Sequence, residues 1–120
     1  MKVLIVDDEE DILQFLSYNF VKEGFTVVTA LNGRDGLAIA IQELPDIIIS
    51  DILMPIMTGD EMYRHIKENS ETSQIPFVFL TAVNDDYEVL KAMSSGADQF
   101  INKPIAPKYL ISVINDLLKK

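Results

Sequence analysis

The chain has no cysteine and no tryptophan among its 120 residues. The absence of cysteine excludes a disulfide framework and a thiolate metal site. No stretch has the composition of a linker, an internal repeat or a low-complexity segment. Hydrophobic residues make up 48% of the sequence, a content typical of a packed globule and not of a disordered chain. We therefore expect one domain spanning residues 1–120, which buries roughly two-thirds of its unfolded surface.

Basic residues and long apolar runs are also scarce. Ten lysine and arginine residues stand against nineteen aspartate and glutamate residues, which gives a net charge of −9. This balance argues against direct binding to nucleic acid, because phosphate contacts require clusters of basic side chains. Only four apolar residues follow Lys2 before an acidic run begins at Asp7, so the N-terminus has no signal-peptide pattern. No run approaches the length of a membrane span, and we expect a cytoplasmic protein without membrane contact.

The sequence does contain short apolar runs that each end at a residue able to handle phosphate or a metal. Runs of this length, rich in β-branched and aromatic residues, predict strands buried on both faces, as in a parallel sheet. The runs are 3–6 before Asp7 and Asp8, 47–50 before Asp51, 78–80 before Thr81, and 99–102 before Lys103. Parallel strands end at one edge of the sheet, and ligands of open α/β sheets bind at that edge. The sequence therefore predicts three carboxylates, a hydroxyl and an ammonium group in one place.

Helical patterns separate the predicted strands. A first helix follows Asp8 and continues to about Lys22, with Ile12, Leu16 and Phe20 on one face. The other predicted elements are a strand at 26–30, a helix between Asn32-Gly33 and Pro45 that carries Leu37, Ala40, Ile41 and Leu44, a third helix with Met62 and Ile66, a fourth from about 85 to 95, and a last helix from about 107 to 118. This alternation predicts an α/β domain with a five-stranded parallel sheet and helices on both faces. Right-handed crossovers leave few strand orders, and the order 2-1-3-4-5 brings strands 1 and 3 together.

Three carboxylates at one sheet edge need a cation. Two such groups 4 Å apart repel by about 4 kcal/mol at an effective dielectric constant of about 20. Hard oxygen ligands favour Mg²⁺, and a carboxylate beside bound Mg²⁺ can attack a phosphoryl donor to form an aspartyl phosphate. Lys103 and the Thr81 hydroxyl would then contact the phosphoryl oxygens. Each residue alone has a simpler explanation, such as a helix cap or an exposed charge, so the prediction depends on finding all of them at strand ends.

Six segments occur in an order and spacing that is highly specific in combination. They are Val6-Asp7-Asp8-Glu9, Asp51-Ile52-Leu53-Met54-Pro55, Gly59, Leu80-Thr81-Ala82, Gly96-Ala97-Asp98 and Lys103-Pro104. With these segments the chain resembles a response-regulator receiver domain of two-component signalling, from Lys2 to about Leu118. The flavodoxin-like order 2-1-3-4-5 is also the strand order of this family, so that topology is not independent of the resemblance.

The resemblance implies a signalling switch that catalyses only its own phosphotransfer and dephosphorylation. Asp51 would accept the phosphoryl group from a phosphohistidine of a partner histidine kinase or phosphotransfer protein. Asp7 and Asp8 would hold Mg²⁺ together with Asp51, and the backbone carbonyl of Leu53 would complete the protein ligands.

The resemblance also implies how phosphorylation is read. Thr81 and Lys103 would contact the phosphoryl group. Thr81 would act as a switch together with Phe100, at a position where the family often has tyrosine or phenylalanine. The peptide bond between Lys103 and Pro104 would be cis. The apolar side chains of Leu53 and Val83 lie at positions that tune dephosphorylation in the family, and we expect them to hinder water and prolong the phosphoryl lifetime.

Two surfaces are candidates for partners. The last helix carries Ile111 and Leu118 beyond its core stripe, and these with Tyr109 and Phe100 would form a contact patch for a second copy or an effector domain. Scattered exposed apolar residues explain them equally well. By resemblance, this output surface comprises helix 4, strand 5 and helix 5. The kinase would dock on the first helix and the neighbouring loop after strand 5, and Leu13, Phe15 and Tyr18 of that helix lie outside its main stripe.

Two other functions remain as alternatives. A phosphatase or phosphotransferase of the aspartyl-phosphate type needs a second acid or base and a cap over its substrate, but the chain is too short for a cap and Asp51 is not part of an Asp-x-Asp pair. A receiver that acts only as an unphosphorylated binding or scaffold module would be favoured by a missing acidic, threonine or lysine position, and none is missing.

Overall fold

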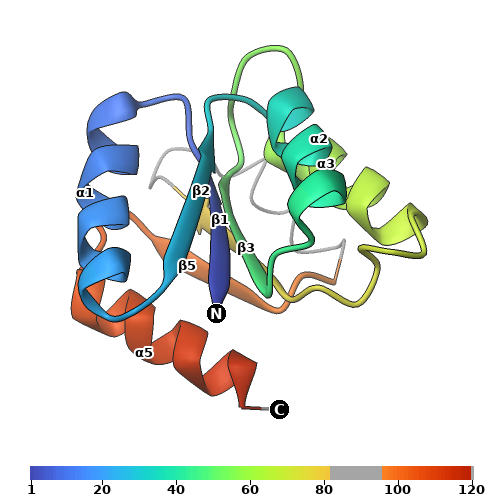
Figure 1. Ribbon diagram of the computed structural model, residues 1–120. Helices are drawn as coiled ribbons and strands as arrows, with labels where there is room; N and C mark the ends of the chain where they lie inside the picture. Colours follow the sequence, from blue (N-terminus) through green and yellow to red (C-terminus); the bar gives the residue numbers. More distant parts are fainter. Residues whose placement is uncertain (82–95, 120) are drawn as a thin grey trace.

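The predicted strands form one parallel sheet in the order β2-β1-β3-β4-β5. The computed structural model describes residues 1–81 and 96–119, and Figure 1 shows the sheet between two layers of helices. The strands are β1 (Lys2–Val6), β2 (Thr26–Ala30), β3 (Ile47–Asp51), β4 (Phe77–Thr81) and β5 (Gln99–Asn102). The predicted fold class and strand order are therefore confirmed, and β1 pairs directly with β3.

Four helices are described, and they cover both faces of the sheet. They are α1 (Glu10–Lys22), α2 (Gly33–Glu43), α3 (Gly59–Glu68) and α5 (Pro107–Leu118). In Figure 1, α1 and α5 lie on one side of the sheet and α2 and α3 on the other. The helix predicted at 85–95 lies outside the described residues. Within the described parts of the chain, no helix combines the length and apolar character needed to cross a membrane.

Strand β1 shows why the predicted strands are apolar without alternation. Val3 and Ile5 belong to the core beneath α1 and α5, and Leu4 and Val6 belong to the core beneath α2 and α3. All four side chains are fully buried. Because successive residues of a strand point to opposite faces, a strand covered on both sides needs an apolar residue at every position.

Two helices begin with side chains that satisfy their free backbone donors. The Asn32 side chain accepts a hydrogen bond from the Asp35 N–H at the start of α2. At the start of α3, Thr58 and Glu61 form a reciprocal capping box. These caps fix where α2 and α3 begin, directly beside the carboxyl edge of the sheet.

Two helical faces differ from the sequence prediction. Leu13 was expected outside the main stripe of α1, but it is buried with Leu16 and Phe20, whereas Ile12 is only partly buried. The buried positions follow a spacing of three and four residues, so the face in contact with the sheet is rotated by one position from a strict four-residue stripe.

The predicted contact patch on α5 is also smaller than expected. Ile111 is 8% exposed and packs in the core with Leu110 and Ile114, because α5 rests on both the sheet and α1. Tyr109 is 60% exposed, whereas Leu118 and Phe100 are partly buried. The prediction that Ile111 belongs to an exposed contact patch is therefore wrong.

Candidate functional site

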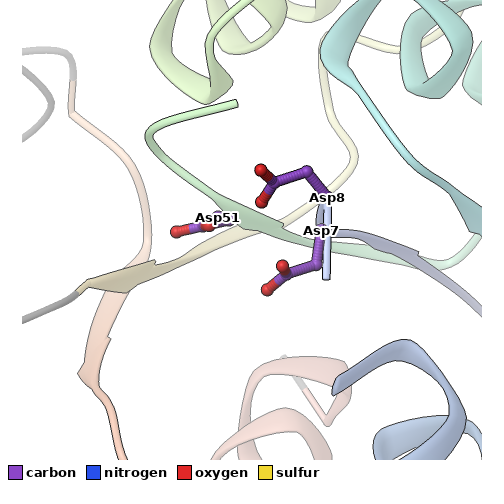
Figure 2. A group of neighbouring side chains, drawn as sticks. All are labelled: Asp7, Asp8 and Asp51. Atoms are coloured by element: carbon purple, nitrogen blue, oxygen red, sulfur yellow. The ribbon is translucent and has the colours of Figure 1, made fainter. Parts of the chain in front are cut away.

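Three carboxylates meet at the carboxyl edge of β1 and β3. Asp7 and Asp8 follow β1, and Asp51 is the last residue of β3. Since β1 and β3 are neighbours, oxygen atoms of all three side chains come within 4.8 Å of one another. Figure 2 shows the three side chains gathered at the ends of the two strands. The structure thus brings together the three carboxylates that the sequence placed at this edge.

Asp7 and Asp51 are buried, and Asp8 is exposed. The Asp7 carboxylate accepts a hydrogen bond from the Glu9 N–H at 2.9 Å, and the Asp51 carboxylate accepts one from the Ile52 N–H at 2.9 Å. These bonds hold two of the three carboxylates in place. Asp8 leaves one side of the cluster open to solvent, so an ion or a substrate has a route to it.

Lys103 enters the same cluster from the end of β5. Its ammonium nitrogen lies 3.2 Å from Asp7 Oδ2, 3.4 Å from Asp51 Oδ2 and 3.8 Å from Glu9 Oε1. The Lys103 N–H also donates to the Thr81 carbonyl at 2.7 Å, and the Lys103–Pro104 peptide bond is cis, as expected. The sequence placed Lys103 at this edge but did not predict that it would bind two of the carboxylates, nor that Glu9 would lie nearby.

Burial and mutual repulsion dominate the electrostatics of the carboxylates. Burial, reinforced by the charge of Asp7, raises the pKa of Asp51 from 3.8 to about 6, although Lys103 and the Ile52 N–H act in the opposite direction. Burial also raises the pKa of Asp7, against the effects of the Glu9 N–H and Lys103. For Lys103, burial acts to lower the pKa, but the charges of Asp51 and Asp7 outweigh it and raise the pKa above its ordinary value. The site therefore holds more negative charge than one lysine stabilises.

Thr81 lies next to the cluster at the end of β4. Its side chain is buried, and its hydroxyl donates a hydrogen bond to Asn102 Oδ1 at 2.7 Å. The two residues are paired across β4 and β5. The sequence prediction missed Asn102; its position directly before Lys103 was the one available signal.

Phe100 is partly buried against β4. Its ring stacks on Phe79 with 5.5 Å between centroids and 24° between the ring planes. The side chain therefore packs toward the core beneath α2 and α3. Val83, predicted to influence the phosphoryl lifetime, lies outside the described residues.

The residues after Asp51 form a short loop that leads into α3. The Leu53 side chain is 44% exposed, and its backbone lies two residues from Asp51. At the end of the loop, the Gly59 N–H donates to the Ile52 carbonyl at 2.7 Å. A Cβ atom at Gly59 would overlap the Asp51 carbonyl oxygen, so this close approach requires glycine.

The donor set fits a hard divalent cation. All three side chains offer carboxylate oxygens, which are the ligands that Mg²⁺ prefers. Their repulsion is opposed by one described cation, Lys103. Burial, with repulsion from neighbouring carboxylates added to it, raises the pKa of Asp51 and Asp7, and an added cation would stabilise their charged forms.

Comparison with known proteins decides the family. The family model of the response regulator receiver domain matches residues 3–115. The chain belongs to the response regulator receiver family. Receiver domains of this family act in two-component signalling, generally use Mg²⁺, and interact with histidine kinases.

Individual relatives agree with this assignment. The chain is 34% identical to the response regulator SaeR of Staphylococcus aureus over 118 residues, which cover 98% of this chain and 50% of SaeR. The receiver domain thus spans about half the length of the curated relatives that it matches.

Solved structures show the same fold. The chemotaxis response regulator CheY4 of Vibrio cholerae has a TM-score of 0.88 and 34% identity, with 97% of each chain covered. The signal receiver domain of a signal transduction histidine kinase from Syntrophus aciditrophicus has a TM-score of 0.87 and 34% identity, with 98% of this chain and 89% of that chain covered. These similarities support a receiver domain.

Proposed function

We propose that this receiver domain is a phosphorylation-dependent switch in which Asp51 accepts a phosphoryl group from a phosphohistidine on a partner histidine kinase or phosphotransfer protein. The observation that carries this proposal is the cluster of three carboxylates within 4.8 Å, with Lys103 3.4 Å from Asp51. Of the three, Asp51 is buried at the end of β3 beside both Lys103 and Asp7. Lys103 is therefore close enough to form an ion pair with a phosphoryl group carried by Asp51.

The transfer requires an ionised Asp51. A carboxylate oxygen of Asp51 forms the new P–O bond, the P–N bond of the phosphohistidine breaks, and the imidazole nitrogen keeps the electron pair. With a pKa of about 6, Asp51 is mostly ionised at neutral pH and is therefore available as the nucleophile. Asp51 attacks without a general base because it carries no proton in that state.

Asp7, Asp8 and Asp51 would hold Mg²⁺, with the backbone carbonyl of Leu53 as a further ligand. When bound, Mg²⁺ neutralises charge on the carboxylates and on the phosphoryl oxygens. Asp7 and Asp51 supply buried ligands, and Asp8 supplies an exposed one. The Lys103 ammonium group, now between Asp7 and Asp51, would form an ion pair with a phosphoryl oxygen.

The output of the switch would begin at Thr81. Its hydroxyl now donates to Asn102, and it would exchange this acceptor for a phosphoryl oxygen of Asp51. Movement of Thr81 would change the space available to Phe100, which stacks on Phe79 two residues before Thr81's strand partner Asn102. The surface of β5, α5 and the helix predicted at 85–95 would then present a different face to a second copy or an effector domain. The exposed Phe15 and Tyr18 on α1 are where we expect the kinase to dock.

The proposal is tested by measuring the intact mass of the protein after incubation with acetyl phosphate, with and without Mg²⁺. One Mg²⁺-dependent phosphoryl adduct is expected on the unmodified protein and on Asp11→Asn, an exposed aspartate in the first turn of α1. Asp51→Asn should form no adduct. An unreactive wild-type protein would favour a binding module without phosphorylation, and an adduct on Asp51→Asn would assign the phosphoryl group to another residue.

A further inference from the structure

The loop at 52–58, between β3 and α3, contains an unfavourable backbone conformation. Ile56 has a φ of 72°, a region that a β-branched residue rarely occupies. Its neighbours form a γ-turn, in which the Met57 N–H donates to the Pro55 carbonyl at 2.7 Å. A γ-turn with a positive central φ is rare and strained. The Ile56 side chain is 66% exposed, so its own burial does not explain the strain.

A contact from α2 holds this loop. The Gly33 N–H donates to the Met57 carbonyl at 3.1 Å. Gly33 is the first residue of α2, where backbone N–H groups have no acceptor within the helix. The next turn is satisfied separately, because the Asn32 side chain accepts from Asp35 and the Asn32 carbonyl from Gly36. The Gly33 donor is thus directed to the loop of a different βα unit.

This contact leaves no room for a side chain on Gly33. A Cβ atom there would lie 2.5 Å from the Met57 carbonyl oxygen, 3.0 Å from the carbonyl carbon and 3.1 Å from Met57 Cβ. The two nearest atoms belong to the backbone and cannot be relieved by a rotamer change. Any larger residue at position 33 must therefore move the loop or the start of α2.

We propose that Gly33 is a positioning residue for the candidate metal site. Its N–H and its lack of a Cβ atom hold Met57, and through Met57 they keep the loop 52–58 in the strained form that presents the Leu53 backbone next to Asp51. Gly33 itself contacts neither an ion nor a phosphoryl group. This inference rests on the proposed function, because it assumes that Mg²⁺ binds to the three carboxylates and to the Leu53 carbonyl.

Three glycine-to-alanine variants separate positioning from a general loss of stability. In Gly33→Ala, the added Cβ atom would overlap the Met57 carbonyl oxygen in the loop 52–58. Gly36→Ala lies one turn further along α2, where its Cβ would meet Met62 Sδ at 2.7 Å and Val6 Cγ2 at 2.9 Å. Gly24→Ala strains a residue with φ +90° that has no neighbouring atom within 4 Å of the added Cβ. All three should lower the unfolding midpoint, but only Gly33→Ala touches the loop.

Mg²⁺ affinity, measured by calorimetric titration with MgCl₂, is the first readout. Gly33→Ala should bind Mg²⁺ about five- to tenfold more weakly than the wild-type protein, which is the size of one net hydrogen bond. Gly24→Ala should stay within about twofold of the wild type, since its stability loss does not reach the site. Gly36→Ala should lose less affinity than Gly33→Ala, because its added Cβ meets the side chains of Met62 and Val6 and not the loop 52–58. Equal affinities for wild type and Gly33→Ala would overturn the positioning role while leaving the proposed function intact. Absence of Mg²⁺ binding by the wild-type protein would instead overturn the metal site and, with it, this inference.

Hydrogen exchange on the unmodified protein tests the same contact without a substitution. If Met57 and Gly33 support the bound form of the loop, then by linkage Mg²⁺ must slow exchange of the Gly33 amide. The Gly24 amide, which donates to the Val21 carbonyl at 3.0 Å at the far end of α1, is the reference. Selective slowing at Gly33 supports the proposal even if Gly33→Ala does not fold. Equal effects of Mg²⁺ on both amides would overturn it.

Discussion

Asp51→Asn should make the metal-free protein more stable at pH 7, although it removes the residue on which the proposed function depends. A carboxyl group whose pKa is raised from 3.8 to about 6 is destabilised in its charged form by up to about 3 kcal/mol, at 1.36 kcal/mol for each factor of ten. Asparagine keeps the size of the side chain and removes the charge. It also gives up the ion pair with Lys103, but that attraction is already included in the raised pKa. Allowing for solvent near Asp8, we expect a gain of about 1–2 kcal/mol.

The sign of the pH dependence follows from the same shift. Between pH 3.8 and about 6 the folded protein binds more protons at Asp51 than the unfolded chain does. The contribution of Asp51 to the free energy of unfolding therefore falls as the pH rises through this range, and the full cost is present above it. In Asp51→Asn this contribution is absent, so the advantage of the variant should grow from acidic to neutral pH.

Urea unfolding in EDTA, followed by circular dichroism at several pH values, measures the effect. Glu71→Gln is the matched control, because it removes one negative charge from an exposed residue in the turn after α3 and should change the free energy of unfolding by less than about 0.5 kcal/mol. Addition of Mg²⁺ should stabilise the wild type more than Asp51→Asn. The wild type offers the cation three carboxylates, whereas the variant offers it two. If Asp51→Asn is less stable than the wild type in EDTA at pH 7, the argument from buried carboxylate repulsion is wrong.

The other predictions concern the neighbours of this cluster. Lys103→Met should destabilise the metal-free protein by about 2 kcal/mol or more, because two buried carboxylates lose their cation, and unfolding curves should show that Mg²⁺ restores much of the loss; no loss in EDTA would contradict this. Ile56→Gly should leave stability unchanged or raise it by up to about 1 kcal/mol, since glycine accepts a positive φ. The same change at the helical Ile41 should cost about 1 kcal/mol, and equal losses at both positions would remove the case for strain. Asn102→Ala frees the Thr81 hydroxyl, so the steady-state fraction of acetyl-phosphate adduct, measured by intact mass, should rise about two- to tenfold; an unchanged fraction would mean that Asn102 does not compete.

The fold was predictable because burial on both faces leaves a direct record in the sequence. The run at 47–51 is apolar up to its last two residues, and all five of its side chains are buried. Alternation of such runs with helical patterns leaves few topologies. The same logic located the three carboxylates, because the end of a strand also fixes the place of the residue that follows it.

Contacts between different βα units were not predictable in the same way. The bonds from Lys103 to Asp7 and from Thr81 to Asn102 depend on side-chain directions that only the assembled sheet defines. The bond between Gly33 and Met57 joins the first residue of α2 to the loop 52–58, which is distant in sequence. Local periodicity contains no signal for such contacts. It also failed to fix the rotation of α1 and α5 on the sheet, because both helices carry more apolar residues than one stripe requires.

The charges of the cluster explain why a divalent cation suits this site better than a monovalent one. Asp7, Asp8 and Asp51 together carry three negative charges when ionised, and Lys103 offsets one of them. Glu9 lies 3.8 Å from Lys103 but is largely solvated, with 62% of its side chain exposed, so water screens most of its charge. A remaining charge of two is neutralised by one divalent cation, whereas a monovalent cation would leave a negative site facing a phosphoryl donor. Because repulsion between that site and an incoming phosphoryl anion would oppose transfer, Na⁺ or K⁺ at the ionic strength of the Mg²⁺ experiment should not support formation of the Asp51 adduct from acetyl phosphate, and an adduct of equal yield in those salts would contradict this charge argument.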